Sequence, residues 1–265
     1  MKKTIYIIAV ALVFTLVSCH KKDVVKINGT ITNGAGKTMW IEELTPDGPQ
    51  FIDSLRLDSK GQFKFTHPYT YQTFYYLHAS PTDYIVLLPY KGEEVKVTGD
   101  IDSLDRSYYV EGSQECTLLW QLQDYSNMGT RKLMEVLAKD QANRAQYGFD
   151  TPAYKEAKKE TDSLFREAYD EQFLYLSRYI TENSGSLSTI IALYKPFNGD
   201  RPVIDVDRYP ELFTFYEMVI EGLEADDELK DNPHTIHFKN VVERVRYQAE
   251  RNMPQASGMQ LTVGE

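Results

Sequence analysis

The spacing of apolar residues changes once along the chain, near Gly112, and this change limits the possible folds most strongly. Before it, apolar and polar residues alternate, as in residues 62–65 (Gln-Phe-Lys-Phe), and a period of two is typical of strands with one buried face. After it, apolar residues recur every three or four positions, as on a helix. We therefore expect an α+β protein with a β domain over residues 24–112 and a helical domain over residues 113–252.

Turn-forming residues separate the expected strands at short intervals. Examples are residues 33–34 (Asn-Gly) and 91–92 (Lys-Gly), where glycine supplies the positive φ that tight turns require. Several short strands with this spacing predict an antiparallel β-sandwich or a small barrel. Residues 74–77 and 84–88 are more continuously apolar, so we expect them to be central strands or strands covered on both faces.

The helical half begins with residues 114–146, which we expect to form one helix or two that meet at residues 127–129 (Asn-Met-Gly). Thr151 and Pro152 then provide an N-cap and a first-turn proline for a long helix. Its apolar stripe comprises Phe165, Tyr169, Phe173, Leu176 and Ile180.

Three shorter helices are expected after the long one. The first begins near Ser186 and ends at Pro196, and the second carries an apolar stripe over residues 212–223. The third begins at Asn232-Pro233. Residues 253–265 contain a proline and two glycines and are interpreted as a linker-like tail.

The first nineteen residues have the layout of an export signal. Two lysines precede an apolar run over residues 5–17, which is short for a membrane-spanning helix. The run ends in Leu-Val-Ser-Cys (residues 16–19), which resembles the lipobox of bacterial lipoproteins. We expect a signal peptide over residues 1–18, acyl chains such as palmitate on Cys19, and a tether over residues 19–23. Several acyl chains hold a protein stably at a membrane.

This motif predicts a lipid-anchored protein of the cell envelope. His20 rather than aspartate follows Cys19, which favours the outer membrane; the periplasmic and surface sides both remain open. The formal net charge of −10 argues against nucleic acid as a partner, because nucleic acid selects a basic face.

Little in the chain indicates catalysis. Cys116 is the only cysteine after Cys19, so the mature chain has no Cys-x-x-Cys motif, and we expect Cys116 to be a small buried or half-buried residue. His234 and His237 have a spacing that could share a metal, but a solvated helix start is favoured. The acids over residues 226–231 are interpreted as loop or cap residues. We predict no catalytic residues, no cofactor and no metal.

Tyrosine is abundant, with nineteen in the chain. Tyr71, Tyr75 and Tyr76 cluster and are candidate contacts for a ligand or partner, because tyrosine combines a large contact area with little entropy to lose. Packing on a sheet face is the competing interpretation, and it is the favoured one.

A series of short motifs resembles a known family. In order, they are Asp53-Ser54, Asp58-x-x-Gly61-x-Phe63-x-Phe65, Tyr75-Tyr76, Gly99-Asp100 and Glu111-Gly112-Ser113. They resemble the N-terminal domain of unknown function of Bacteroidetes-type thioredoxin-like lipoproteins. In that family a β domain and a helical segment precede a thioredoxin-like domain, and residues 261–264 (Leu-Thr-Val-Gly) resemble its opening. A stand-alone form, a split gene and a fragment are all compatible with a chain that ends there.

The resemblance implies a function without chemistry in this chain. We expect a membrane-anchored, non-catalytic interaction or positioning module associated with a thioredoxin-like partner. The alternative is a surface lipoprotein that binds a glycan or another small ligand.

Overall fold

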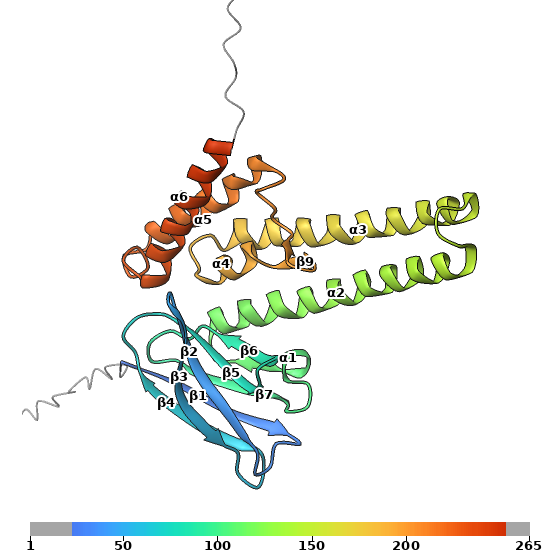
Figure 1. Cartoon of the computed structure of the whole chain (residues 1–265). Helices are drawn as coiled ribbons and strands as arrows, with labels where there is room; N and C mark the ends of the chain where they lie inside the picture. The colour runs from blue at the N-terminus through green and yellow to red at the C-terminus, as the bar shows by residue number, and fades with distance from the viewer. Residues whose placement is uncertain (1–22, 253–265) are drawn as a thin grey trace, which may run out of the picture.

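The computed structural model describes residues 23–252, in which two four-stranded sheets form a sandwich and are followed by a layer of helices (Figure 1). The expected α+β class is confirmed. The first sheet has the order β4 (Gln62–Pro68), β1 (Val24–Thr32), β7 (Glu94–Asp100), β8 (Tyr109–Glu111). The second has the order β3 (Gly48–Arg56), β2 (Thr38–Thr45), β5 (Phe74–Ser80), β6 (Asp83–Leu87).

The alternating sequence pattern builds the inner faces of both sheets. Ile27 of β1 lies opposite Phe65 of antiparallel β4 and Val95 of parallel β7, and all three side chains are buried. Ile41 and Leu77 pair in the same way across β2 and β5. Facing rows of buried side chains form the core of a sandwich.

The two continuously apolar strands differ in position. β5 is internal, between β2 and β6, whereas β6 is the edge strand of its sheet. Ile85 and Leu87 of β6 face the sandwich core, and Val86 packs against the helical core instead. The sequence of β6 is therefore continuously apolar because both faces of the strand are covered.

The helical part contains two long helices and several short elements. They are α2 (Gln114–Tyr147), α3 (Pro152–Glu182), α4 (Ser188–Leu193), the strands β9 (Pro196–Asn198) and β10 (Arg201–Pro202), the 3-10 helix η1 (Pro210–Leu212), α5 (Phe213–Glu224) and α6 (Pro233–Asn252). One short helix, α1 (Leu104–Ser107), lies instead in the sandwich part, between β7 and β8. Within residues 23–252, no helix combines the length and apolarity needed to cross a membrane.

Helices α2 and α3 form an antiparallel hairpin whose far end projects from the body (Figure 1). The alternative of a break at residues 127–129 is wrong, because α2 is continuous. Gly129 lies against α3, where an added Cβ would be 1.7 Å from Nε2 of the buried Gln172. The glycine permits a close approach of two helices and does not end one.

The predicted start of α3 is confirmed. The Thr151 hydroxyl accepts a hydrogen bond from the Tyr154 N–H at 3.1 Å, and Pro152 occupies the first turn. Along the predicted stripe, Leu176 and Ile180 are buried, whereas the residues nearer the N-terminus of α3 are only half-buried. The stripe therefore leaves rings accessible at its N-terminal part.

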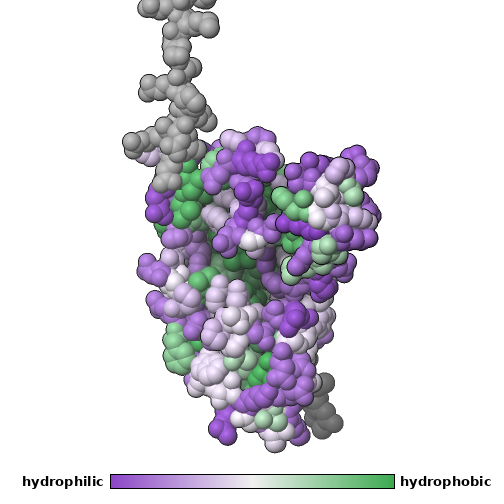
Figure 2. All heavy atoms as spheres, turned by 45° about the vertical axis from the view of Figure 1, so that its right-hand side comes forward, coloured by the Kyte–Doolittle hydropathy of each residue, from purple (hydrophilic) through white to green (hydrophobic). Residues whose placement is uncertain are grey.

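The sandwich and the helices share a second core. Phe74 of β5 and Leu88, just after β6, belong to the same apolar cluster as Leu122 of α2, Leu193 of α4 and Phe238 of α6. On the face shown in Figure 2, hydrophobic residues lie in recesses flanked by hydrophilic ones. Because the cluster draws on both parts, the described residues form one body.

Buried polar contacts also cross this junction. Asn232 caps α6 through the His234 N–H at 2.9 Å, and its amide donates to the Gln72 carbonyl at 2.8 Å. The His234 ring lies 3.0 Å from the Thr73 hydroxyl and 5.1 Å from the ring of Phe74. The predicted solvated helix start is thus wrong at His234, which is only 8% exposed because the sandwich covers the first turn of α6.

Candidate functional site

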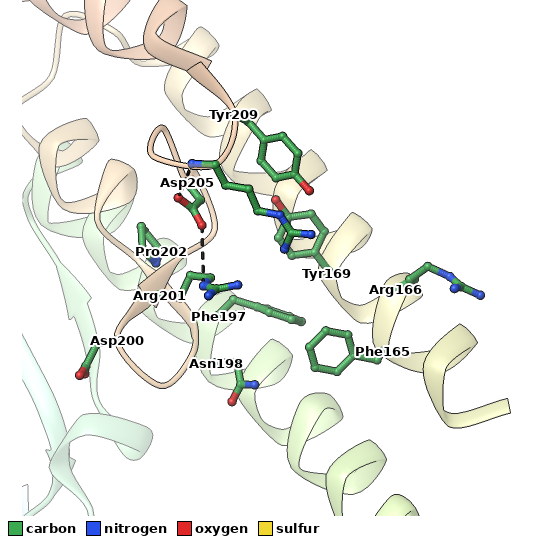
Figure 3. Close-up of a pocket in the computed structure, with 11 residues that line it drawn as sticks. Phe165, Arg166, Tyr169, Phe197, Asn198, Asp200, Arg201, Pro202, Asp205 and Tyr209 are labelled. Carbon is green, nitrogen blue, oxygen red and sulfur yellow. Dashed lines mark hydrogen bonds and ion pairs between the residues drawn. The ribbon is translucent and has the colours of Figure 1, made fainter. Parts of the chain in front are cut away.

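A groove with a volume of about 690 Å³ lies between α3, the β9–β10 hairpin and the loop before η1 (Figure 3). Pockets of this size commonly hold ligands. Four rings line it, those of Phe165, Tyr169, Phe197 and Tyr209. Three guanidinium groups join them, those of Arg166, Arg201 and Arg208. We call this site the aromatic groove.

Local sequence explains how the groove is built. Phe165 and Tyr169 are four residues apart and lie on the same side of α3. The opposite wall is the β9–β10 hairpin, whose turn contains Gly199 at φ 64°. Buried Val203 anchors the hairpin, and its N–H donates to the Lys195 carbonyl at 2.9 Å. A fixed helix and an anchored hairpin therefore form the two walls.

The rings hold one another in place. The Phe197 ring packs edge-on against Phe165 and Tyr169, with both pairs of centroids 5.3 Å apart, an arrangement that favours aromatic pairs. The Tyr169 hydroxyl donates to the Val203 carbonyl at 3.0 Å. Burial raises the pKa of Tyr169 above its usual value, so the hydroxyl stays protonated at neutral pH. The apolar wall is therefore preformed.

The charges of the groove are only partly balanced. Asp205 accepts a hydrogen bond from the Arg208 N–H at 3.1 Å and lies 3.8 Å from the Arg201 guanidinium. The Arg208 guanidinium lies over the Tyr209 ring, 5.3 Å from its centroid. Among the side chains that the structure describes, no carboxylate forms an ion pair with the guanidinium of Arg166 or Arg208. Both can therefore bind an incoming anion.

The three tyrosines predicted as contacts do not share a surface. Tyr75 is 3% exposed in the sandwich core, with its ring against Phe65. Tyr76 points to the opposite face of β5 and stacks on Tyr84 with centroids 5.1 Å apart. Tyr71 precedes β5, and its ring lies 6.4 Å from that of His234. The structure brings together a different set of rings from the one singled out in the sequence.

Sequence reasoning missed the aromatic groove. It assigned Phe165 and Tyr169 to the apolar stripe of a long helix and singled out neither Phe197 nor Arg201. One signal was available, since residues 197–209 combine rings and arginines in a segment without a helical pattern. Loops with such residues often carry binding sites.

Cys116 is buried, as predicted, and it belongs to the sandwich core although it lies on α2. Its sulfur accepts a hydrogen bond from the Leu88 N–H at 3.2 Å, and burial raises the pKa of the thiol to about 12. A thiol with this pKa is a poor nucleophile at neutral pH.

Cys19, the leader over residues 1–18 and the tail over residues 253–265 lie outside the described residues.

A smaller pocket of about 220 Å³ lies between β6 and α2 and contains the side chain of Lys195. Its ammonium group donates to the Gln123 side-chain carbonyl at 2.6 Å. Burial lowers the pKa of Lys195 to about 8, so a fraction of this amine is neutral at slightly alkaline pH.

The acidic and histidine motifs have structural roles. Asp226 accepts hydrogen bonds from the N–H groups of Glu228 and Leu229 at 2.8 and 3.1 Å, so it caps its own turn. Burial lowers the pKa of His234 to about 4. The described residues contain no group of three or more His, Cys, Asp or Glu side chains placed to hold a metal ion.

Comparison with known proteins identifies one domain. Residues 25–119 match the model of a domain of unknown function (DUF4369), which covers the sandwich and the start of α2. No curated protein and no solved structure is significantly similar to the chain. The predicted domain of unknown function is thereby confirmed. The aromatic groove lies outside the matched residues.

Proposed function

We propose that the protein is a lipid-anchored envelope lipoprotein that acts as a non-catalytic interaction or positioning module. Cys19 carries the lipid, and the partner is a thioredoxin-like domain or protein. Three features support this proposal: the lipobox-like residues 16–19, the DUF4369 match, and the sequence resemblance to the N-terminal part of thioredoxin-like lipoproteins.

One observation carries the proposal: a preformed aromatic groove is held in a fixed relation to the start of β1. The sandwich and the helices share a core, so the two parts move together. β1 begins on the sandwich, whereas the groove lies on the helical part. A body tethered through the sandwich and open to a partner on its helical part suits a positioning role.

A crosslinking experiment tests the partner. A photoreactive phenylalanine analogue replaces Tyr209 at the groove or, as the matched control, Phe51, which is 64% exposed on β3. After irradiation of intact cells, a thioredoxin-fold protein should be crosslinked from the groove position and not from the control. Equal yields at both positions, or no thioredoxin-fold product, would contradict the proposed partner.

The anchor has a separate test. Replacing Cys19 with alanine should abolish labelling by radioactive palmitate and release the protein from the membrane fraction. Retained labelling would disprove Cys19 as the lipid site.

A second candidate function is the binding of a glycan or small ligand. The aromatic groove favours it because Asn198 and Asp200 lie beside the rings, and polar groups next to aromatic faces are typical of ligand sites. A glycan array should then show binding that Phe197→Ala removes. An array without binding to the parent protein would exclude the glycans that it displays.

A further inference from the structure

We propose that the aromatic groove binds an acidic peptide segment of the partner, in which an aromatic side chain is flanked by carboxylates. This inference rests on the proposed function and deepens it, because it states the chemistry by which the partner is recognised.

The first step concerns charge. The chain is acidic, with a formal net charge of −10, yet three arginines and only two aspartates line the groove. Asp205 is already engaged by Arg201 and by the Arg208 N–H, and its side chain is only 13% exposed. The guanidinium groups of Arg166 and Arg208 remain open to a ligand. Guanidinium binds carboxylate through paired, charge-assisted hydrogen bonds, so the groove selects an anion over a cation.

The second step concerns the apolar wall. Phe165, Tyr169 and Phe197 form one edge-to-face array whose ring positions are fixed. A ligand ring can join this array at little entropic cost, because the wall is already ordered. Tyr209, with Arg208 above it, adds a ring that is 36% exposed. The ligand therefore carries an aromatic group in addition to its negative charge.

The third step concerns shape. Arg166 is on α3 and Arg208 is on the loop before η1, over the Tyr209 ring, so the two arginines come from different walls of the groove. Figure 3 shows the Arg166 side chain beyond Phe165, extending away from the rings. A ligand with one carboxylate on each side of its ring matches this order. Arg201 is already paired with Asp205, which leaves Arg166 and Arg208 as the expected contacts. An extended peptide with two carboxylates can contact both arginines, whereas a small molecule with a single carboxylate can contact only one of them.

Binding of a fluorescein-labelled peptide, Gly-Glu-Phe-Glu-Gly, to residues 19–265 purified without lipid provides the test. Comparison peptides contain Gln-Phe-Gln, Glu-Ala-Glu or Lys-Phe-Lys at the centre, and anisotropy gives each Kd. Replacing both glutamates with glutamine should weaken binding about tenfold or more, because charge-assisted hydrogen bonds are lost. Raising the salt concentration should also weaken it.

The protein variants are Arg166→Gln and Arg208→Gln, with Arg178→Gln as the control. Arg178 is on α3, like Arg166, but it pairs with Glu182 and lies outside the groove. Each groove variant should weaken peptide binding about threefold to tenfold, and the control should not change it. Phe197→Leu should weaken the Glu-Phe-Glu peptide more than the Glu-Ala-Glu peptide, because it removes only the aromatic contact.

Equal affinity for the Glu and Gln peptides, or equal effects of the groove and control variants, would overturn the inference. Competition by free phenylacetate as strong as that by the peptide would also overturn it in favour of a small ligand. The crosslinking experiment separates the two proposals. Crosslinks that do not depend on Arg166 and Arg208 would refute the inference and leave the function standing. Arginine-dependent peptide binding without a crosslinked thioredoxin-fold partner would support the inference and refute the proposed partner.

Discussion

The sandwich and the projecting α2–α3 hairpin are stabilised in different ways. In the sandwich, fully buried apolar side chains such as Ile27 and Leu77 fill the space between two sheets. In the outer half of the hairpin, the hydroxyl of Tyr154 donates to Asp140 at 3.0 Å and accepts from Arg144 at 3.1 Å. The sandwich therefore depends on a large buried apolar volume, whereas the outer hairpin combines a few buried apolar side chains, such as Leu133 and Val136, with these polar contacts. The junction between the sandwich and the helices contains both buried apolar side chains and buried polar contacts.

The largest effect is expected from removing volume in the sandwich. Leu77→Ala creates a cavity at a fully buried position and should lower the free energy of unfolding by about 3–4 kcal/mol. Phe51→Ala on β3 is the control, and because Phe51 is exposed it should cost less than about 1 kcal/mol. Urea denaturation followed by circular dichroism measures both. Similar losses for the two variants would show that the sandwich is not packed as described.

A smaller loss is expected where α5 meets the turn between α3 and α4 without room for a side chain. An added Cβ on Gly222 of α5 would lie 2.5 Å from the backbone carbonyl of Ser184. Gly222→Ala should therefore destabilise the protein by about 2–3 kcal/mol, although alanine is the better helix former. Gly129→Ala should cost less, because its neighbour is the movable side chain of Gln172. Thermal unfolding gives the order, and a stabilising Gly222→Ala would contradict the close packing.

The polar junction should respond to acid. Burial holds the pKa of His234 at about 4, against 6.5 for the ordinary side chain. Between these two pH values, the unfolded chain binds a proton at His234 and the folded chain does not. The neutral His234 side chain therefore makes its full contribution to the free energy of unfolding above pH 6.5, and this contribution is lost as the pH falls towards 4. Lowering the pH from 7.5 to 5 should cost about 2 kcal/mol through this group. His234→Gln should reduce that dependence, and an unchanged pH profile would count against a buried neutral imidazole.

The smallest effect is expected in the hairpin. Tyr154→Phe removes the hydroxyl shared by Asp140 and Arg144 and should cost about 1 kcal/mol. Hydrogen exchange should become faster in the outer parts of α2 and α3 and stay unchanged in the sandwich. Tyr147→Phe, on the same hairpin, is the matched control. Equal effects of the two variants would remove the special role of this contact.

The sequence predicted the features that depend on local pattern. Alternation over residues 24–112 predicted a sheet protein, and Thr151 with Pro152 marked the start of α3 to the residue. The parallel pairing of β1 with β7 could not be predicted, because a period of two is the same in parallel and antiparallel strands. The helix break considered at Gly129 was wrong. Glycine occupies this position because Gln172 of α3 packs against it and leaves no room for a side chain.

The aromatic groove could not be predicted for a related reason. Its rings come from α3 and from residues 197–209, and no local pattern states that these segments meet. The burial of His234 has the same origin, since Thr73 lies 161 residues away in sequence. Only motifs whose partners are near in sequence were interpreted correctly, such as the cap formed by Asp226.

The parallel pairing of β1 has a consequence for the order of folding. The first strand of the body pairs with residues 62–68 on one side and residues 94–100 on the other, so its sheet cannot close until about seventy further residues have emerged. Contacts between distant segments slow folding. A chain that emerges amino-terminus first would therefore be able to pair β1 with β4, while the other edge of β1 stays unpaired until β7 follows.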